Sequence, residues 1–151
     1  MYRMLVLAVA LVLSASAADA ADFLLKKQSP HSVSETLDRL TKVMQGKGIS
    51  IFARVDHQAG AKSVDLQLKP SQLLIFGNPR MGTPLMQANP EIGIALPLKV
   101  LAWEDKDGKV WLAYTKPDVL KSRYSISGKD KIFQQMTGAL DNLTNAAIKA
   151  K

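Results

Sequence analysis

Cysteine is absent from the 151 residues of the chain. This absence excludes disulfide bonds, thiolate metal sites and cysteine nucleophiles. Aromatic residues make up only 6% of the sequence, and no basic run is interleaved with aromatics as single-strand nucleic-acid binders require. The formal net charge is +7, but no run of Lys and Arg exceeds two residues. We therefore expect a solvated basic surface and no nucleic-acid partner.

An uninterrupted apolar run long enough to cross a membrane is also absent. Near the N-terminus, an arginine precedes the apolar stretch Met4–Leu13 and a run of small residues. This is the pattern of a secretory signal peptide, and the stretch is shorter than the ~20 residues that cross a bilayer. We expect residues 1–20 to form a signal peptide cleaved after Ala17 or Ala20, with an uncleaved N-terminal anchor as the alternative.

The remaining sequence, residues 21–151, has the length of one domain with a single core. Hydrophobic residues make up 47% of the chain, which allows such a core to form without disulfides. We find no internal repeat, low-complexity tract or linker. The prediction is a single exported domain, located in a bacterial periplasm or secreted, with no membrane span after signal cleavage.

Two helices are predicted from apolar periodicity. Ser32 and Glu35 have the spacing of a capping box, and the apolar residues that follow keep a helical period until Gly46 or Gly48. The second helix, Lys129–Ala150, is longer and carries an apolar stripe with the same period. Both helices therefore have one face to bury.

One short strand is predicted before the first helix, at Phe23–Gln28, and two more are predicted between the helices, at Ile49–Asp56 and Leu73–Phe76. Two apolar segments, Glu91–Asp105 and Lys109–Tyr114, flank an Asp-Gly turn, which is a strong hairpin signal. The predicted fold class is α+β. It has a single antiparallel sheet with a central hairpin, packed by an N-terminal helix and a long C-terminal helix.

Both faces of the predicted hairpin are apolar. Strand parity groups Leu101 and Trp103 with Leu112 and Tyr114 on one face, and leaves further apolar side chains on the other. A sheet with one solvent-exposed face would alternate polar residues outward. Either the domain covers both faces or a second copy covers one, and we expect a homodimer.

Turn residues are concentrated in one segment. Four prolines and three glycines lie between Gly77 and Pro97. Thr83 is expected to cap a short helix over Thr83–Ala88, with Pro84 at its first position. So much turn chemistry beside strands predicts a shaped surface, and this is where we expect a binding site.

Two of the candidate contacts in this segment are polar. Arg80 and the backbone N–H groups near Thr83 together suit a carboxylate or phosphate. Asn78 precedes Pro79, and its alternative role is to hydrogen-bond its local backbone in an Asx turn. No phosphate-loop motif occurs in the sequence.

His57 is the most informative polar residue outside this segment. It continues the parity of Ile51 and Val55, and so it is expected at the core-facing row where the strand ends. There it would act as a ligand, a proton carrier or a metal donor, because imidazole titrates near neutral pH. The alternative is a histidine that satisfies backbone groups in a loop.

Soft metal binding is a second possibility for the same residue. His57 with Met81 or Met86 would form a thioether and imidazole site of the type that copper selects. Methionine is also a common core filler, which is the alternative.

The sequence around these residues resembles the domain of unknown function 302 family. The resemblance is carried by Val55–His57, by Leu73–Pro79 with its Phe-Gly-Asn-Pro turn, and by Ile94–Glu104 with its Ala-Leu-Pro-Leu lead into the hairpin. It spans roughly Ser32–Tyr124. It implies a small single-domain α+β fold, often found as a homodimer, with no established activity.

From the sequence we expect non-catalytic binding of a small molecule or an envelope partner, without a cofactor. The ligand-binding candidates are His57, Asn78, Arg80, Thr83 and Met86. The alternatives are periplasmic copper binding and a hydrolase or isomerase with His57 as general base. No second catalytic group accompanies His57 in the sequence.

Overall fold

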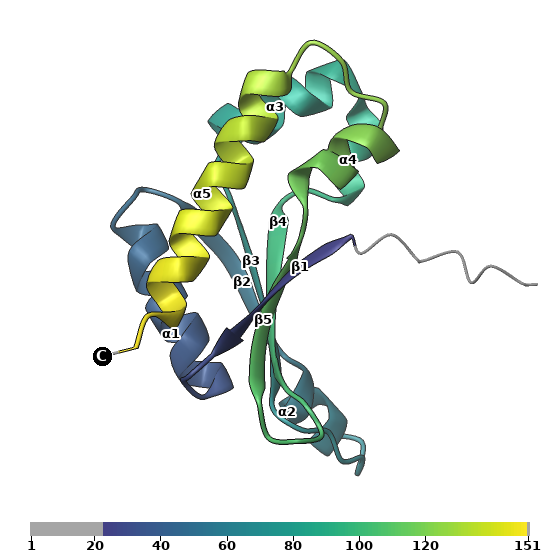
Figure 1. The fold of residues 1–151 in the computed structure, drawn as a ribbon. Helices are drawn as coiled ribbons and strands as arrows, with labels where there is room; N and C mark the ends of the chain where they lie inside the picture. The colour runs from purple at the N-terminus through teal and green to yellow at the C-terminus, as the bar shows by residue number, and fades with distance from the viewer. Residues whose placement is uncertain (1–22, 151) are drawn as a thin grey trace, which may run out of the picture.

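A computed structural model describes residues 23–150 of the chain, so the predicted signal peptide lies outside the described residues. The fold is a single five-stranded antiparallel sheet in the order β1-β5-β4-β3-β2, with helices α1 and α5 side by side on one face (Figure 1). In chain order the elements are β1 (Leu24–Ser29), α1 (Val33–Gln45), β2 (Ser50–Asp56), α2 (His57–Lys62), β3 (Ser71–Gly77), α3 (Pro79–Ala88), the 3₁₀ helix η1 (Pro90–Ile94), β4 (Leu98–Glu104), β5 (Val110–Thr115), α4 (Pro117–Arg123) and α5 (Asp130–Ile148). The predicted α+β class, with its central hairpin and two packing helices, is confirmed.

Helix α1 begins at the predicted cap. The Ser32 hydroxyl oxygen accepts a hydrogen bond from the Glu35 backbone N–H at 3.2 Å. The Glu35 carboxylate does not complete the capping box, because it lies 3.3 Å from the His31 ring instead. The helix ends at Gly46, and Gly48 then adopts a φ of +68°, a left-handed conformation that glycine tolerates.

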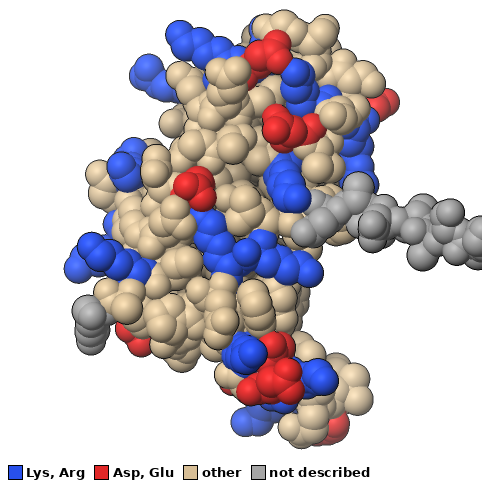
Figure 2. Space-filling model, viewed as in Figure 1, with Lys and Arg blue, Asp and Glu red and all other residues tan. Residues whose placement is uncertain are grey.

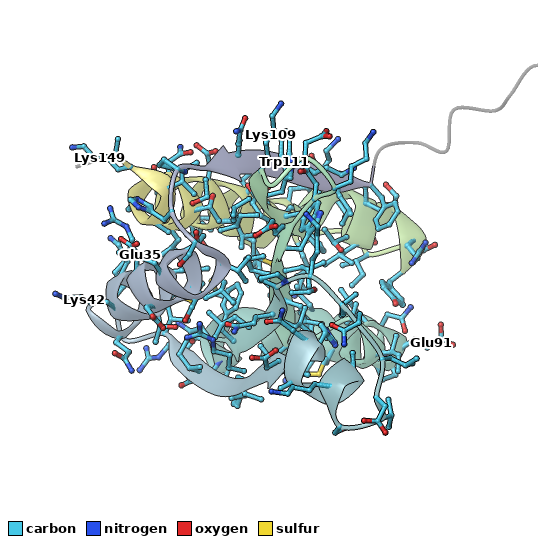
Figure 3. All side chains as sticks on the ribbon, turned by 90° about the horizontal axis from the view of Figure 1, so that it is seen from below. Glu35, Lys42, Glu91, Lys109, Trp111 and Lys149 are labelled. Atoms are coloured by element: carbon cyan, nitrogen blue, oxygen red, sulfur yellow. The ribbon has the colours of Figure 1, made fainter. Side chains whose placement is uncertain are left out.

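Helix α5 carries the predicted apolar stripe, and it is tied to the sheet by Lys27 of β1. The Lys27 ammonium donates to the carboxylate of Asp141 at 2.7 Å, to Thr144 at 2.8 Å and to Asn145 at 2.7 Å. The hydrogen bond from Lys27 lowers the pKa of Asp141 below its ordinary value. Charged side chains of α1 and the C-terminus, such as Lys42 and Lys149, point outward (Figure 3).

The central hairpin is shorter than predicted. Strand β4 begins at Leu98 rather than at Glu91, because Asn89 caps the 3₁₀ helix η1 by accepting from the Glu91 N–H at 3.0 Å. A cis peptide bond precedes Pro97, just before the strand starts. The apolar run Ile92–Pro97 is therefore a turn and a connection, not a strand.

The predicted grouping of side chains on the hairpin faces is wrong by one residue. Val100 pairs with Tyr114 and Ala102 with Leu112, so these four face the helices. Leu101 consequently lies on the opposite face. The register follows from the turn, where the Asp105 carboxylate accepts from the Asp107 and Lys109 N–H groups at 2.9 Å each. A one-residue slip moves every side chain to the other face.

The face away from α1 and α5 is apolar and partly open in the described part of the chain. Val55 of β2 is 39% exposed, and the strand residues beside it are only partly buried. The remaining members of this open face are Leu73, Ile75, Leu101, Trp103 and Trp111. The domain therefore does not cover both faces of its sheet in residues 23–150. Helices α1 and α5 cover one face, and no helix of the described chain covers the other.

The buried side chains form two clusters. The larger cluster lies between the sheet and helices α1 and α5; its members include Leu37, Leu74, Val100, Leu112 and Leu140. The smaller cluster joins α3, η1, α4 and the start of α5; its members include Leu85, Ile92, Leu120, Phe133 and Met136. Leu98, at the start of β4, packs against both clusters.

Candidate binding site at one end of the sheet

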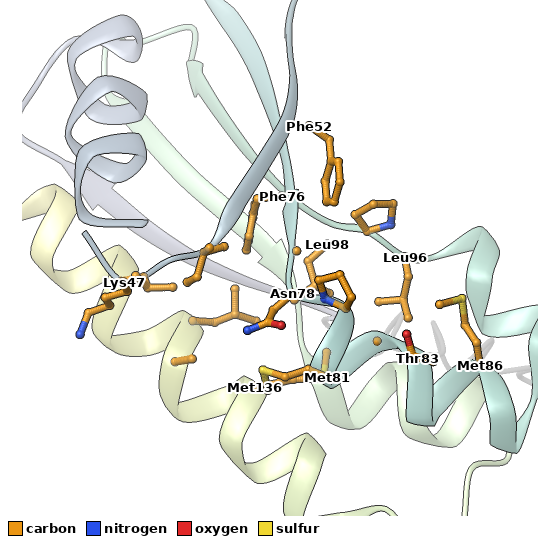
Figure 4. A pocket seen from close by; sticks show the side chains of 18 residues that line it. Lys47, Phe52, Phe76, Asn78, Met81, Thr83, Met86, Leu96, Leu98 and Met136 are labelled. Carbon is orange, nitrogen blue, oxygen red and sulfur yellow. The ribbon is translucent and has the colours of Figure 1, made fainter. Parts of the chain in front are cut away.

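A cavity of about 420 Å³ opens where β3 ends and α3 begins. Its walls come from the ends of β2 and β3, from α3, from the segment before β4, and from the middle of α5 (Figure 4). Volumes of this size suit drug-sized ligands in protein pockets. The cavity lies where the two buried clusters meet, since Met136 of the smaller cluster and Leu140 of the larger one both line it.

The start of α3 differs from the prediction. Asn78 is the cap, because its side-chain oxygen accepts from the Arg80 N–H at 2.9 Å, and Pro79 occupies the first helical position. Thr83 therefore lies inside the helix rather than at its cap, and Pro84 lies in the helix interior. The helix starts five residues earlier than expected, with Pro79 rather than Pro84 at its first position, because Asn-Pro and Thr-Pro carry the same start signal and the first one is used.

This early start removes the predicted anion site near Thr83. Helical N–H groups are unsatisfied only in the first turn. There, the Arg80 N–H is taken by the Asn78 side chain. The Met81 and Gly82 N–H groups both donate to the Asn78 carbonyl, at 2.9 and 3.0 Å. The Arg80 side chain is exposed and does not line the cavity.

Two local features shape the opposite wall. The pairing of β2 with β3 shifts between Ile51 and Ala53, which marks a β-bulge at Phe52, and the Phe52 ring lines the cavity. At Gly77, an added Cβ would lie 3.4 Å from both Phe52 and Pro97. The end of β3 therefore lies within van der Waals reach of Phe52 and Pro97 in the cavity wall.

The lining is almost entirely apolar. Lys47, Asn78 and Thr83 are its three polar residues, and no acidic residue lines it. The side-chain oxygen of Asn78 is used in the cap, and its NH₂ group has no hydrogen-bond partner among residues 23–150. The polar groups left for a ligand are thus an ammonium, an amide NH₂ and a hydroxyl.

The structure brings together three of the five predicted ligand-binding residues. Asn78, Thr83 and Met86 line the cavity, as does Met81. The notable residues that sequence reasoning missed are Lys47, Phe52 and Met136. The apolar stripe of α5 was visible in the sequence, but nothing in it distinguished cavity wall from core.

His57 lies at the opposite end of the β2–β3 pair. Ser50 pairs with Gly77, beside Asn78, whereas Asp56 pairs with Gln72. At ~3.4 Å per residue the two ends are roughly 20 Å apart. His57 is exposed and begins α2, because the Asp56 carboxylate accepts from the Ala59 N–H at 2.9 Å and caps the helix there.

This separation corrects the geometry behind both alternatives. His57 cannot share a metal with Met81 or Met86, because the antiparallel pairing holds them at different ends of the sheet. In residues 23–150 no group of three or more His, Cys, Asp or Glu side chains is arranged to hold a metal ion. His57 also does not line the cavity, so a general base there would have no enclosed substrate to act on.

A second cavity of about 370 Å³ lies between the end of β5 and helix α4. It contains none of the residues predicted from the sequence. Leu98 and Leu140 line both cavities and so form the wall between them. On the face of the molecule seen in Figure 2, Lys and Arg side chains occur in several separate groups rather than in one patch.

The sheet order, the two helices on one face and the cavity at the sheet end define an α+β fold built on one antiparallel sheet. The chain belongs to the family described as "Domain of unknown function DUF302", whose model matches residues 25–143. The resemblance found in the sequence is thereby confirmed. The match also includes most of α5, beyond the Ser32–Tyr124 span inferred from the motifs.

A solved structure shares this fold. The crystal structure of an uncharacterized conserved DUF302 protein from Bacillus stearothermophilus matches with a TM-score of 0.75 at 18% sequence identity. The match covers 84% of this chain and 99% of that one. At this identity the likeness concerns the fold alone.

The chain also matches curated proteins that are longer than it is, and the match covers only a part of each. "Fluoride-specific ion channel FluC 1" of Brucella suis is 50% identical over 99 residues, which are 66% of this chain and 39% of that protein. "Fluoride-specific ion channel FluC 2" of Brucella melitensis gives the same identity over 37% of its length. The chain thus spans less than two fifths of these relatives. In residues 23–150, no helix combines the length and hydrophobicity needed to cross a membrane.

Proposed function

We propose that this domain binds a small, largely apolar molecule without catalysis, in the cavity between α3 and α5. The observation that carries the proposal is the cavity itself, of about 420 Å³, with Asn78 and Thr83 among otherwise apolar walls. Clefts with apolar walls and a few placed polar groups are the usual form of small-molecule sites. An exported setting is supported by the signal-peptide pattern of residues 1–20.

The channel activity in the names of the Brucella relatives is not part of this proposal. The match covers 37% to 39% of those proteins, so most of each named channel lies outside it. A DUF302-like sequence within a chain named as an ion channel does fit a role at the cell envelope. We therefore propose that the domain acts at the cell envelope and that its ligand is a small molecule.

The test is the binding of a neutral dye that fluoresces in apolar surroundings, phenyl-naphthylamine. Ala139→Phe places a large ring in the cavity wall and is expected to weaken dye binding about tenfold or more. Ala146→Phe is the matched control, because Ala146 is exposed on the same helix. Equal dye binding by wild type and Ala139→Phe, with both folded by circular dichroism, would contradict the proposal.

Native mass spectrometry of the protein purified from its own envelope then reports any molecule that it carries. The same spectrum gives the mass of the mature chain. Export predicts an N-terminus after Ala17 or Ala20, and a mass that retains residues 1–20 would argue against signal cleavage.

We also propose that a second copy of the chain covers the open face. Its central side chains, including Leu101 and Trp103, are apolar, and its charged members are Lys26 and Lys99. On a chain of net charge +7, this neutral centre is where an identical copy meets the least repulsion. A two-fold contact uses the same patch on both copies, and an apolar sheet face is self-complementary.

Light scattering tests this pairing. Wild type is expected at dimer mass and Leu101→Glu at monomer mass, because a carboxylate would be buried at the contact. Ile94→Glu is the control, since Ile94 is 81% exposed and belongs to η1 rather than to a strand of the open face. A monomeric wild type at high concentration would refute the dimer and leave the cavity proposal intact.

A further inference from the structure

We infer that the ligand is a single-chain anionic amphiphile, with its apolar chain in the cavity and its charged end at Lys47. This inference rests on the proposed function and adds the class of ligand. Lys47 is the one charged residue of the cavity lining, and no carboxylate side chain opposes it there. Its ammonium forms no ion pair within residues 23–150.

The Asn78 amide in the cavity wall also favours a ligand whose polar end accepts hydrogen bonds. The Asn78 side chain has spent its oxygen on the helix cap and offers only N–H donors. An ammonium and an amide NH₂ both donate, so the polar end of a ligand here must accept hydrogen bonds. A negatively charged acceptor gains more from these donors than a neutral one, because charge-assisted hydrogen bonds are the stronger ones.

The position of Lys47 sets the orientation of the ligand. Lys47 is exposed and lies in a tight turn between Gly46 and Gly48, directly after α1. In Figure 4 it lies at one side of the cavity, Asn78 lies near the middle, and Met86 lies at the far side. A charged head that remains near water at Lys47 therefore leaves the chain to run along the apolar cavity wall toward Met86.

The methionine side chains in the cavity wall suit an unbranched chain. Three methionines line the cavity: Met81, Met86 and Met136. Their unbranched thioether side chains adapt to the shape of what they contact. An added Cβ at Gly82 would meet only ordinary contacts, with Leu96 at 3.7 Å and Met86 at 4.0 Å, so this glycine leaves space rather than a tight fit.

The experiment compares dodecanoate with dodecanol, which share the chain and differ in the charge of the head. Both are titrated below their aggregation concentrations, at neutral pH and low salt, by displacement of phenyl-naphthylamine. Wild type is expected to prefer dodecanoate by about three- to tenfold. Raising the salt concentration should reduce this preference, because the head is close to solvent.

Lys47→Gln is expected to abolish the preference, because it should lower the affinity for dodecanoate more than the affinity for dodecanol. Lys42→Gln is the matched control, because Lys42 is exposed on α1 and does not line the cavity, and it should keep the preference. Equal affinity for the two compounds in wild type, or a preference that survives Lys47→Gln, overturns the inference while dodecanol binding still supports the cavity. If neither compound displaces the dye, the proposed function itself fails.

Discussion

The two ends of the β2–β3 pair have the same kind of helix cap but differ in how the capped helix is packed. At one end Asp56 follows β2 and caps α2, with its carboxylate 2.9 Å from the Ala59 nitrogen. At the other end Asn78 follows β3 and caps α3, with its amide oxygen 2.9 Å from the Arg80 nitrogen. Each end is thus a strand that passes through an Asx cap into a helix.

What differs is the packing against each helix. Helix α3 contacts η1, and its end of the sheet shares a cavity with α5. Helix α2 has no buried residue and projects from the lower end of the sheet in Figure 1. The side chains of Val64 and Leu66, just after it, are 62% and 63% exposed. The cap starts the helix, but segments distant in sequence decide whether a site forms beside it.

The largest contrast between the two ends is expected from truncating an apolar side chain at each. Leu140→Ala removes a side chain that is 2% exposed, and should lower the free energy of unfolding by about 2–5 kcal/mol. Val64→Ala, at the α2 end, should change it by less than about 0.5 kcal/mol. Urea denaturation of the two variants measures both values. Similar losses would mean that the α2 end is also packed.

Removing the two caps separates stability from binding. Asn78→Ala and Asp56→Ala each delete a side-chain cap and should each cost about 1 kcal/mol of stability. Asn78→Ala should also weaken the proposed binding of dodecanoate, because Asn78 lines the cavity. Asp56→Ala should leave it unchanged, since that end lines no part of the cavity. A binding loss with Asp56→Ala would indicate communication between the ends.

A matched pair of glycines sharpens the comparison further. Gly82 lies in α3 and Gly60 in α2, and alanine at either should raise stability by about 0.5–1 kcal/mol through helix propensity. An added Cβ meets nothing within 4 Å at Gly60, whereas at Gly82 it enters the cavity wall. Thermal melts should therefore respond alike, and dye affinity should change only for Gly82→Ala.

The smallest expected effect concerns the contact between Lys27 of β1 and Asp141 of α5. Because Lys27 lowers the pKa of Asp141, their contact stabilises the fold above the unfolded pKa of about 3.9 and is lost as pH falls through the lower folded value. Lys27→Met should remove this part of the acid dependence. Lys26→Met should retain it, since Lys26 points to the other face of β1. Urea midpoints from pH 7 downward measure the difference.

Much of the fold was predictable because its signals are local. The Ser32 cap, the Asp-Gly hairpin turn and the stripe of α5 each specify an element within a few residues. Errors arose where two local signals competed. Asn78-Pro79 and Thr83-Pro84 both have the sequence pattern of a helix start. Only the tertiary structure shows that α3 begins at the first of them.

The lining of the candidate cavity was predictable only in part, for a different reason. Asn78, Thr83 and Met86 were found because turn chemistry marks their segment. Phe52 depends on a bulge, and Met136 on how a distant helix docks, so neither position follows from local sequence. His57 was misplaced because the Asp56 cap ends the strand before the parity argument reaches it.

Leu98 and Leu140 separate the two cavities, since each side chain lines both. For a ligand held at Lys47, this partition keeps the apolar chain in the first cavity, on the path toward Met86, and out of the second cavity. Shortening either leucine would join the cavities into one passage toward α4. The space open to the chain of the proposed ligand thus depends on two aliphatic side chains.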